Sequence, residues 1–265
     1  MAPHPRLLHT RGRASRPAAA GRDGPPDRRP SRPCRVPGSV RPPVPVAEPV
    51  VLRHRRRPAH RLHPADVELK ITCDDVTYRS GHLSRMRYHA VLLRDRRPVA
   101  EAEAAFGCAS PAVYRRLRAG APRTALPLPQ ALPPRDVGRD HPHDVVLAAA
   151  GRPGRWQLRA DTTHPILFDH PVDHVPGMVL LEAARQAAQA LCCASHRQTP
   201  IAMDSVFTRY VEFGSPCYIE AEHIHSAGSG PRVRVRGVQD GDETFSATLT
   251  LRSPVRTQDR RGGLL

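Results

Sequence analysis

HVPGMVLLEAARQAAQALCCA, residues 174–194, is the stretch that decides the fold of this chain. From Met178 to Ala194 it is rich in Ala and Leu and has no internal Gly or Pro, which predicts a stable helix. Four strand-like runs follow, at 201–213, 216–225, 232–239 and 244–252. Gly-Ser-Gly-Pro and Asp-Gly-Asp between the later runs are typical of hairpin turns. One apolar helix followed by antiparallel strands predicts an α+β domain over 144–253, with the sheet around a central helix.

A second, smaller folding unit is predicted over residues 66–119. Its three runs, ADVELKIT from Ala65, LSRMRYHAVLLR from Leu83 and PVAEAEAAFGCAS from Pro98, alternate with a period of two and indicate strands. The run PAVYRRLR (111–118) indicates a short helix or turn. The strand, hairpin and strand that end this unit parallel those that end the later domain. This parallel indicates a duplicated fold whose first copy lacks its helix.

Three further segments are expected to lie outside the two units. Residues 1–65 are dominated by Arg, Pro, His, Ala and Gly, and such a composition buries too little apolar surface to offset the entropy of ordering. We therefore predict that they are disordered. An out-of-frame translation of a GC-rich gene is the alternative, because regular patterning begins abruptly at Asp66. The proline-rich stretch 120–143 is predicted to be a linker, and 254–265 a tail.

Composition and charge exclude several classes of function. The net charge is +16, but residues 1–65 hold 15 Arg against three acidic side chains, so the folding part is almost neutral. With no Arg stripe interleaved with aromatic residues, a nucleic-acid partner is not expected. The six cysteines form no CxxC pair, which favours a reduced, cytoplasmic protein. No apolar run approaches the roughly 20 residues of a membrane span, so no membrane partner is expected either.

Two segments carry a resemblance to a known family. The segment FDHPVDHVPGMVLLEAARQA (168–187) closely resembles the second repeat of AfsA-type A-factor (γ-butyrolactone) biosynthesis proteins of actinomycetes. Residues 73–118, from CDDVTYRSGHLSRMRYHAV to AVYRRLR, resemble the back half of their first repeat. The resemblance implies a double hot-dog fold, in which 144–253 is a complete second repeat. The first repeat, 66–119, would be truncated, since no equivalent of its helix occurs in residues 1–65.

The resemblance also implies an activity. Members of this family are acyltransferases that move a β-ketoacyl group from acyl carrier protein to the hydroxyl of dihydroxyacetone phosphate. This is the committed step toward γ-butyrolactone signals, which control secondary metabolism in a form of quorum signalling. No cofactor is expected, because the thioester is already an activated acyl group. A homodimer is left open. The alternatives are a hot-dog dehydratase or thioesterase acting on acyl thioesters, and a non-catalytic remnant of the family.

The predicted helix carries two candidate site residues. Glu182 and Arg185 are three positions apart on an otherwise apolar helix, so they share one face. By resemblance they stand where the family's functional helix residues stand. Arg185 could bind a phosphate or a developing oxyanion, and Glu182 could act as general base, with the apolar helix face lining an acyl tunnel. The alternative is a structural ion pair between the two side chains.

The loop before the helix supplies the other candidates. His170 and His174 are candidate acid–base residues, and His170 resembles the histidine of the hot-dog dehydratases, although its interval to the Pro-Gly turn is shorter. Asp173 is a candidate helix cap or substrate-binding residue, and Gly177 is a second candidate for substrate binding. The four-residue spacing of the histidines is that of two metal ligands on a helix. Flanking prolines exclude a helix here, so no metal is expected.

The adjacent thiols Cys192 and Cys193, at the far end of the helix, have no paired base in the sequence. A thiol nucleophile is therefore not expected.

Overall fold

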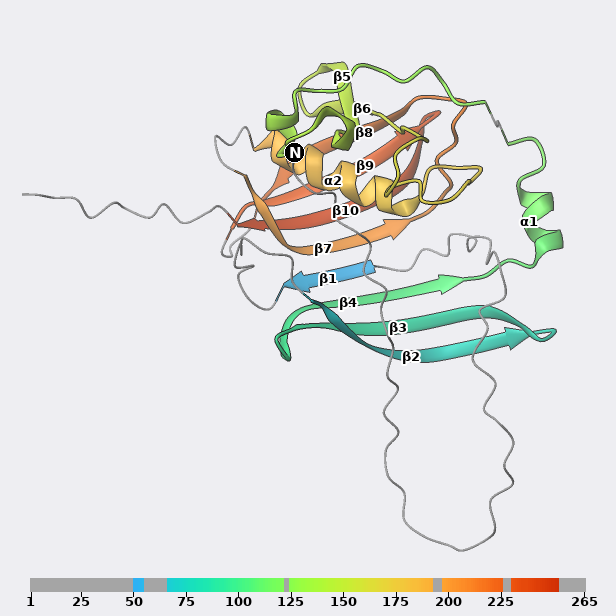
Figure 1. Ribbon diagram of the computed structural model, residues 1–265. Coiled ribbons are helices and arrows are strands. Elements are labelled where there is room, and N and C mark those ends of the chain that lie inside the picture. Colours follow the sequence, from blue (N-terminus) through green and yellow to red (C-terminus); the bar gives the residue numbers. More distant parts are fainter. Residues whose placement is uncertain (1–49, 55–65, 122–123, 193–196, 226–229, 253–265) are drawn as a thin grey trace, which may run out of the picture.

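The computed structural model describes residues 50–54, 66–121, 124–192, 197–225 and 230–252. Its described part contains one antiparallel sheet of ten strands in the order β2-β3-β4-β1-β7-β10-β9-β8-β6-β5 (Figure 1). The strands are β1 (Val50–His54), β2 (Glu68–Arg79), β3 (His82–Arg94), β4 (Arg97–Gly107), β5 (Leu147–Arg152), β6 (Arg155–Leu158), β7 (Thr199–Phe207), β8 (Cys217–Ile224), β9 (Arg232–Gln239) and β10 (Asp242–Arg252). The helices are α1 (Pro111–Leu117) and α2 (Gly177–Leu191), with 3-10 turns η1 (Pro134–Val137) and η2 (Pro142–Asp144).

The sheet is built from two halves that repeat one strand order. The series β1-β4-β3-β2 in the first half matches the series β7-β10-β9-β8 in the second, and the two series meet where β1 pairs with β7. At this junction Val51 lies opposite Asp204. The two strand–hairpin–strand patterns of the sequence thus occupy corresponding positions, β3–β4 in one half and β9–β10 in the other.

Helix α2 forms the core with the second half of the sheet. Its buried face consists of Val179, Leu180, Ala183, Ala184, Ala187 and Ala188, each at most 2% exposed. These side chains pack against the sheet, where Ile219, Val233, Val235, Phe245 and Leu249 are fully buried. The predicted helix of 178–194 therefore exists, beginning at Gly177 and ending at Leu191. Figure 1 shows α2 lying along this half of the sheet, and alanine at four of these positions keeps the buried face of the helix small.

The first half has no comparable cover in the described part of the chain. Among the described elements, α2 packs mainly against strands β5 to β10 and against η1. Every residue of the edge strand β2 is exposed, including Leu69 at 42% and Ile71 at 57%. None of the described helices is long and apolar enough to cross a membrane.

Two boundaries differ from the prediction. The range 1–65 includes β1, which pairs with both β4 and β7, so the prediction of disorder is wrong for those five residues. Backbone pairing from two neighbouring strands can order a segment that has no strand periodicity of its own. The remaining positions, 1–49 and 55–65, lie outside the described residues, as does the predicted tail.

Part of the expected linker 120–143, around residues 131–139, packs against the second half, although most of its described residues are exposed. Val137 in η1 is fully buried, and Ala131 forms a bridge with Ala148 of β5. A left-handed turn at Gly138 (φ 67°) follows η1 and directs the chain back over α2. Proline prevents regular helices and strands but does not prevent a segment from packing, and this explains the difference.

Candidate functional site

Glu182 and Arg185 lie together on α2, and their side chains bind each other. Arg185 Nη2 lies 2.8 Å from Glu182 Oε1, and its Nε lies 3.0 Å from Oε2. Arg139, which follows η1, forms a second ion pair with Glu182, with 2.6 Å between Nη2 and Oε2. Arg185 Nη2 also donates to the backbone oxygen of Val137 at 3.0 Å. The two candidate residues therefore attach the 134–139 segment to the helix.

Gln186 extends this network into the core. Its Nε2 donates to Glu182 Oε1 at 2.6 Å and to the backbone oxygen of Asp144 at 2.7 Å, while its Oε1 accepts from the N–H of Val146 at 3.0 Å. The side chain is fully buried, so each of these hydrogen bonds satisfies a group that water does not reach. The Glu182 carboxylate thus accepts from three side chains at once.

The electrostatics keep Glu182 ionised. Burial by itself would raise its pKa, but the hydrogen bonds and charges of Arg185 and Arg139 outweigh burial and lower the pKa below its ordinary value. Only 12% of the Glu182 side chain and 19% of the Arg185 side chain are exposed. A carboxylate with a lowered pKa is a weak proton acceptor, and this arrangement favours the structural alternative for the pair.

The two histidines of the preceding loop differ in their surroundings. His170 is exposed, and its Nδ1 lies 2.7 Å from Asp169 Oδ1. His174 is buried, its Nδ1 lies 2.9 Å from Asp173 Oδ1, and its ring packs on Tyr210 with 4.5 Å between centroids. Of the two, only His174 is held in one orientation by both a carboxylate and an aromatic ring.

Asp173 does not cap α2, so that prediction is wrong. The helix begins after Pro176, which makes no side-chain capping hydrogen bond. The Asp173 carboxylate turns instead to His174 and to Tyr114 of α1, whose hydroxyl donates to Oδ1 at 2.5 Å. Gly177 is the first residue of α2 and faces Phe207, whose ring would lie 3.4 Å from a β-carbon at this position.

Arg118, just after α1, completes the cluster. Its Nη2 donates to the backbone oxygen of Asp173 at 2.7 Å and to Glu212 Oε2 at 2.7 Å, and its Nη1 donates to Glu212 Oε1. The guanidinium also lies over the Tyr210 ring, 4.8 Å from its centroid. Tyr114, Arg118 and Glu212 were not predicted from the sequence, because each is a single polar residue in an unremarkable run. We call Tyr114, Arg118, Asp173, His174, Tyr210 and Glu212 the interdomain cluster.

The interdomain cluster sets the protonation of its acid–base pair. Burial would raise the pKa of Asp173, but hydrogen bonds from Tyr114 and His174 and the charge of Arg118 lower it to about 2. Burial lowers the pKa of His174, and this outweighs the opposing effect of Asp173. His174 is therefore neutral near pH 7, with Nδ1–H donated to the Asp173 carboxylate. Among the described residues no side chain or backbone group bonds its Nε2, which remains available as a proton acceptor.

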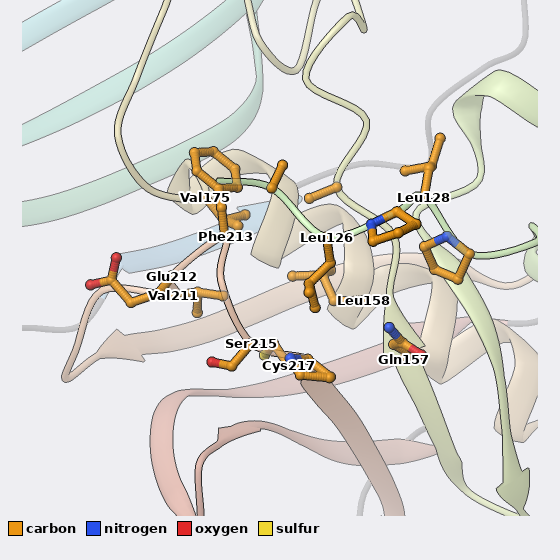
Figure 2. A pocket seen from close by; sticks show the side chains of 15 residues that line it. Leu126, Leu128, Gln157, Leu158, Val175, Val211, Glu212, Phe213, Ser215 and Cys217 are labelled. Carbon is orange, nitrogen blue, oxygen red and sulfur yellow. The ribbon is translucent and has the colours of Figure 1, made fainter. Parts of the chain in front are cut away.

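Two cavities flank this cluster. A small apolar cavity of about 40 Å³ lies on one side, where Figure 2 shows Leu126, Leu158 and Val211 gathered and the Glu212 carboxylate directed away from them. A polar cavity of about 260 Å³ lies on the other, lined by Tyr114, Arg115, Arg118, Ala119, Gly120, Ala121 and Asp173. Neither is lined by α2, whose apolar face is filled by the sheet, so the expected acyl tunnel along that face is not seen in either cavity.

The comparison with known proteins decides the family. Residues 120–253 match the model of the A-factor biosynthesis hotdog domain. The chain belongs to this family. A relative from Streptomyces virginiae, named 2-oxo-3-(phosphooxy)propyl 3-oxoalkanoate synthase, is 49% identical over 76% of this chain and 70% of its own length. A relative of the same name from Streptomyces griseus is 42% identical over 71% of this chain and 63% of its own length.

Solved structures have a weaker likeness to this A-factor biosynthesis hotdog protein. The 12:0-ACP thioesterase from Umbellularia californica has a TM-score of 0.47 and 13% identity, covering 79% of this chain and 73% of that one. The family match begins at residue 120. It therefore includes η1, Arg139 and the rest of the segment that we expected to be a linker.

In this member of the A-factor hotdog family, His143, Asp144 and His164 form a cluster of potential metal ligands. His143 Nε2 and His164 Nε2 lie 3.2 Å and 3.5 Å from Asp144 Oδ1. However, His164 Nδ1 accepts hydrogen bonds from the backbone N–H groups of Ile166 and Leu167, at 3.2 Å and 3.0 Å. The proton of the neutral ring must then reside on Nε2, which lies 3.5 Å from Asp144 Oδ1 and makes no hydrogen bond among the described residues. A metal-binding histidine has the opposite arrangement, so this hydrogen bonding disfavours a metal here.

Proposed function

We propose that the protein is an acyltransferase that moves a β-ketoacyl group from an acyl carrier protein thioester to the hydroxyl of dihydroxyacetone phosphate. Its membership of the A-factor biosynthesis hotdog family supports this activity. So does the name of its relatives, which describes an ester between a 3-oxo acid and a phosphorylated three-carbon ketone. We further propose that the reaction takes place in the cytoplasm.

The observation that carries the chemical part of the proposal is the hydrogen bond between His174 and Asp173. An ionised Asp173 holds the neutral imidazole by Nδ1–H, so the lone pair of Nε2 is free to accept a proton. The attacking hydroxyl would give its proton to Nε2 as its oxygen bonds to the thioester carbonyl carbon. The carbon–sulfur bond then breaks, and the proton passes from His174 to the departing thiolate.

Within this proposal Glu182 and Arg185 have a supporting role. The pair joins α2 to the 134–139 segment, and Gln186 joins the same carboxylate to the start of β5. We therefore assign to them the positioning of the second half rather than proton transfer. A Glu182 variant that folds normally but has lost all turnover would reverse this assignment.

A direct assay tests the activity. The purified chain is incubated with 3-oxoacyl carrier protein, with and without dihydroxyacetone phosphate, and the products are identified by mass spectrometry. We expect the phosphorylated 3-oxoacyl ester, formed only when the acceptor is present. Release of free acid or of an enoyl product at the same rate without the acceptor would instead establish a thioesterase or dehydratase. A folded protein that leaves the thioester intact would identify a non-catalytic remnant.

A further inference from the structure

The polar cavity beside α1 has the chemistry of a binding site. It measures about 260 Å³, and its wall combines one exposed cation, Arg115, with the buried Arg118 and the carboxylate of Asp173. Gly120 also lines it, in a left-handed conformation (φ 93°), and a β-carbon built there would meet nothing within 4 Å. The backbone of Gly120 is therefore directly accessible from the cavity.

Several polar groups on this wall have no hydrogen-bond partner among the described residues. Arg118 Nε is one, although 94% of that side chain is buried. Asp173 Oδ2 is another, because Tyr114 and His174 both bind Oδ1, and among the described residues Oδ2 has only the ion-pair contact with Arg118 Nε at 3.5 Å. Arg115 makes no ion pair within the described chain, and the N–H of Gly120 has no acceptor there. Of these groups only Arg118 Nε is buried, and since buried donors are normally satisfied, this unpaired N–H points to a ligand at this wall, where Arg115, the Gly120 N–H and Asp173 Oδ2 are open to it.

We propose that this cavity binds a small hydroxylated phosphate monoester. Arg115 would hold the phosphate, with the Gly120 N–H as a neutral donor, since guanidinium and backbone N–H groups are the usual partners of phosphate oxygens. Asp173 Oδ2 would accept a hydrogen bond from a hydroxyl group of the same ligand. Dihydroxyacetone phosphate has a single hydroxyl, so this hydroxyl would make the contact with Asp173 on binding and give it up when it turns to donate its proton to His174 Nε2.

This inference rests on the proposed function and extends it by giving the acceptor a location. The polar cavity suits a phosphorylated polyol or ketone and not an acyl chain, because charged and main-chain polar groups line it. The cavity also lies where α1 of the first half meets the loop before α2. Both halves of the chain would then contribute to acceptor binding.

The test is a binding measurement made without any acyl donor. Dihydroxyacetone phosphate and glycerol 3-phosphate are titrated into the full chain by isothermal calorimetry, with dihydroxyacetone as the ligand that lacks phosphate. Arg115→Ala is compared with Arg116→Ala, an exposed arginine on the same short helix that does not line the cavity. We expect saturable binding of both phosphate esters, a loss on the order of ten-fold or more in Arg115→Ala, and no change in Arg116→Ala.

The outcomes separate this inference from the proposed activity. Equal affinities of the two variants for the esters, or equal binding of dihydroxyacetone by the parent chain, would overturn the inference. If Arg115→Ala weakens ester binding but the parent chain transfers no acyl group, the cavity is supported and the proposed activity fails. If transfer occurs and Arg115→Ala leaves the KM for the acceptor unchanged, the activity stands and the cavity fails. Circular dichroism of both variants confirms that the exposed substitutions leave the fold intact.

Discussion

His174 and Asp173 are neighbours in the chain whose side chains also bind each other, with 2.9 Å between Nδ1 and Oδ1. The geometry fixes the imidazole by one nitrogen and leaves the other available. Its carboxylate partner is in turn held by Tyr114, a residue 59 positions earlier in the chain. The interdomain cluster thus ties the orientation of a single ring to the contact between the two halves.

Removal of the proposed base is expected to abolish most of the activity. His174→Ala should lower kcat about 10²–10⁴-fold, the usual contribution of a positioned general base, with a smaller effect on the KM for the acceptor. His170→Ala, which changes an exposed histidine with the same kind of aspartate neighbour, is the matched control and should retain near-parent kcat. Steady-state kinetics of the two variants gives their kcat values. An equal loss of kcat in both would argue against His174 as the base.

The pH profile should follow the protonation of His174. Because burial lowers its pKa below the ordinary 6.5, the imidazole stays neutral to lower pH than a free histidine does. We expect kcat to be constant near neutral pH and to fall only as the pH drops through this lowered value. A kcat profile measured with saturating substrates checks this, and a midpoint above 6.5 would contradict it.

Asp173 is expected to make the unfolding free energy depend on pH in the acid range. Its pKa is about 2 in the folded chain, well below its value of 3.8 in the absence of interactions, so folding favours the ionised form. This stabilisation is complete above pH 3.8 and is lost as the pH falls toward 2. Asp173→Asn should therefore narrow the difference in unfolding free energy between pH 5 and pH 2.5, measured by urea titration. An unchanged difference would show that Asp173 has no such role.

Tyr114 is expected to act through Asp173. Tyr114→Phe removes a hydrogen bond to a charged group, which is worth about 1.5–3 kcal/mol, and should raise the pKa of Asp173. We expect lower thermal stability together with a modest loss of kcat and a shifted pH profile. Tyr78→Phe, at a hydroxyl on the exposed edge strand, is the control. A stability loss without any change in the pH profile would restrict Tyr114 to a structural role.

The variant Glu182→Gln distinguishes a structural role of Glu182 from a catalytic one. The substitution leaves Arg139 and Arg185 without their shared counter-charge in a mostly buried site, which should destabilise the fold by about 3–5 kcal/mol. Thermal unfolding measures this loss, and turnover per folded molecule should remain close to that of the parent. Normal stability with no turnover would instead identify Glu182 as a catalytic residue.

Much of the second half could be predicted because its signals are local. The composition of 178–194 predicts α2, and the alternation in RVRVRGVQ predicts β9, where Val233 and Val235 are both fully buried. The segment 120–143 could not be predicted in the same way. Its prolines suppress any periodic signal, whereas its packing depends on contacts of Val137 and Arg139 with a helix more than 40 residues away.

The sequence by itself determined the family, the helix, the strand alternation and the presence of charged side chains at 182 and 185, since each is written in neighbouring residues. Only the tertiary structure decided which of those charges are neutralised and which histidine is buried. Both depend on desolvation and on the approach of groups far apart in the chain, as with Arg139 at Glu182 and Arg118 at Asp173. No local pattern encodes these approaches, because the first arises only when the 134–139 segment packs on α2 and the second only when the two halves meet.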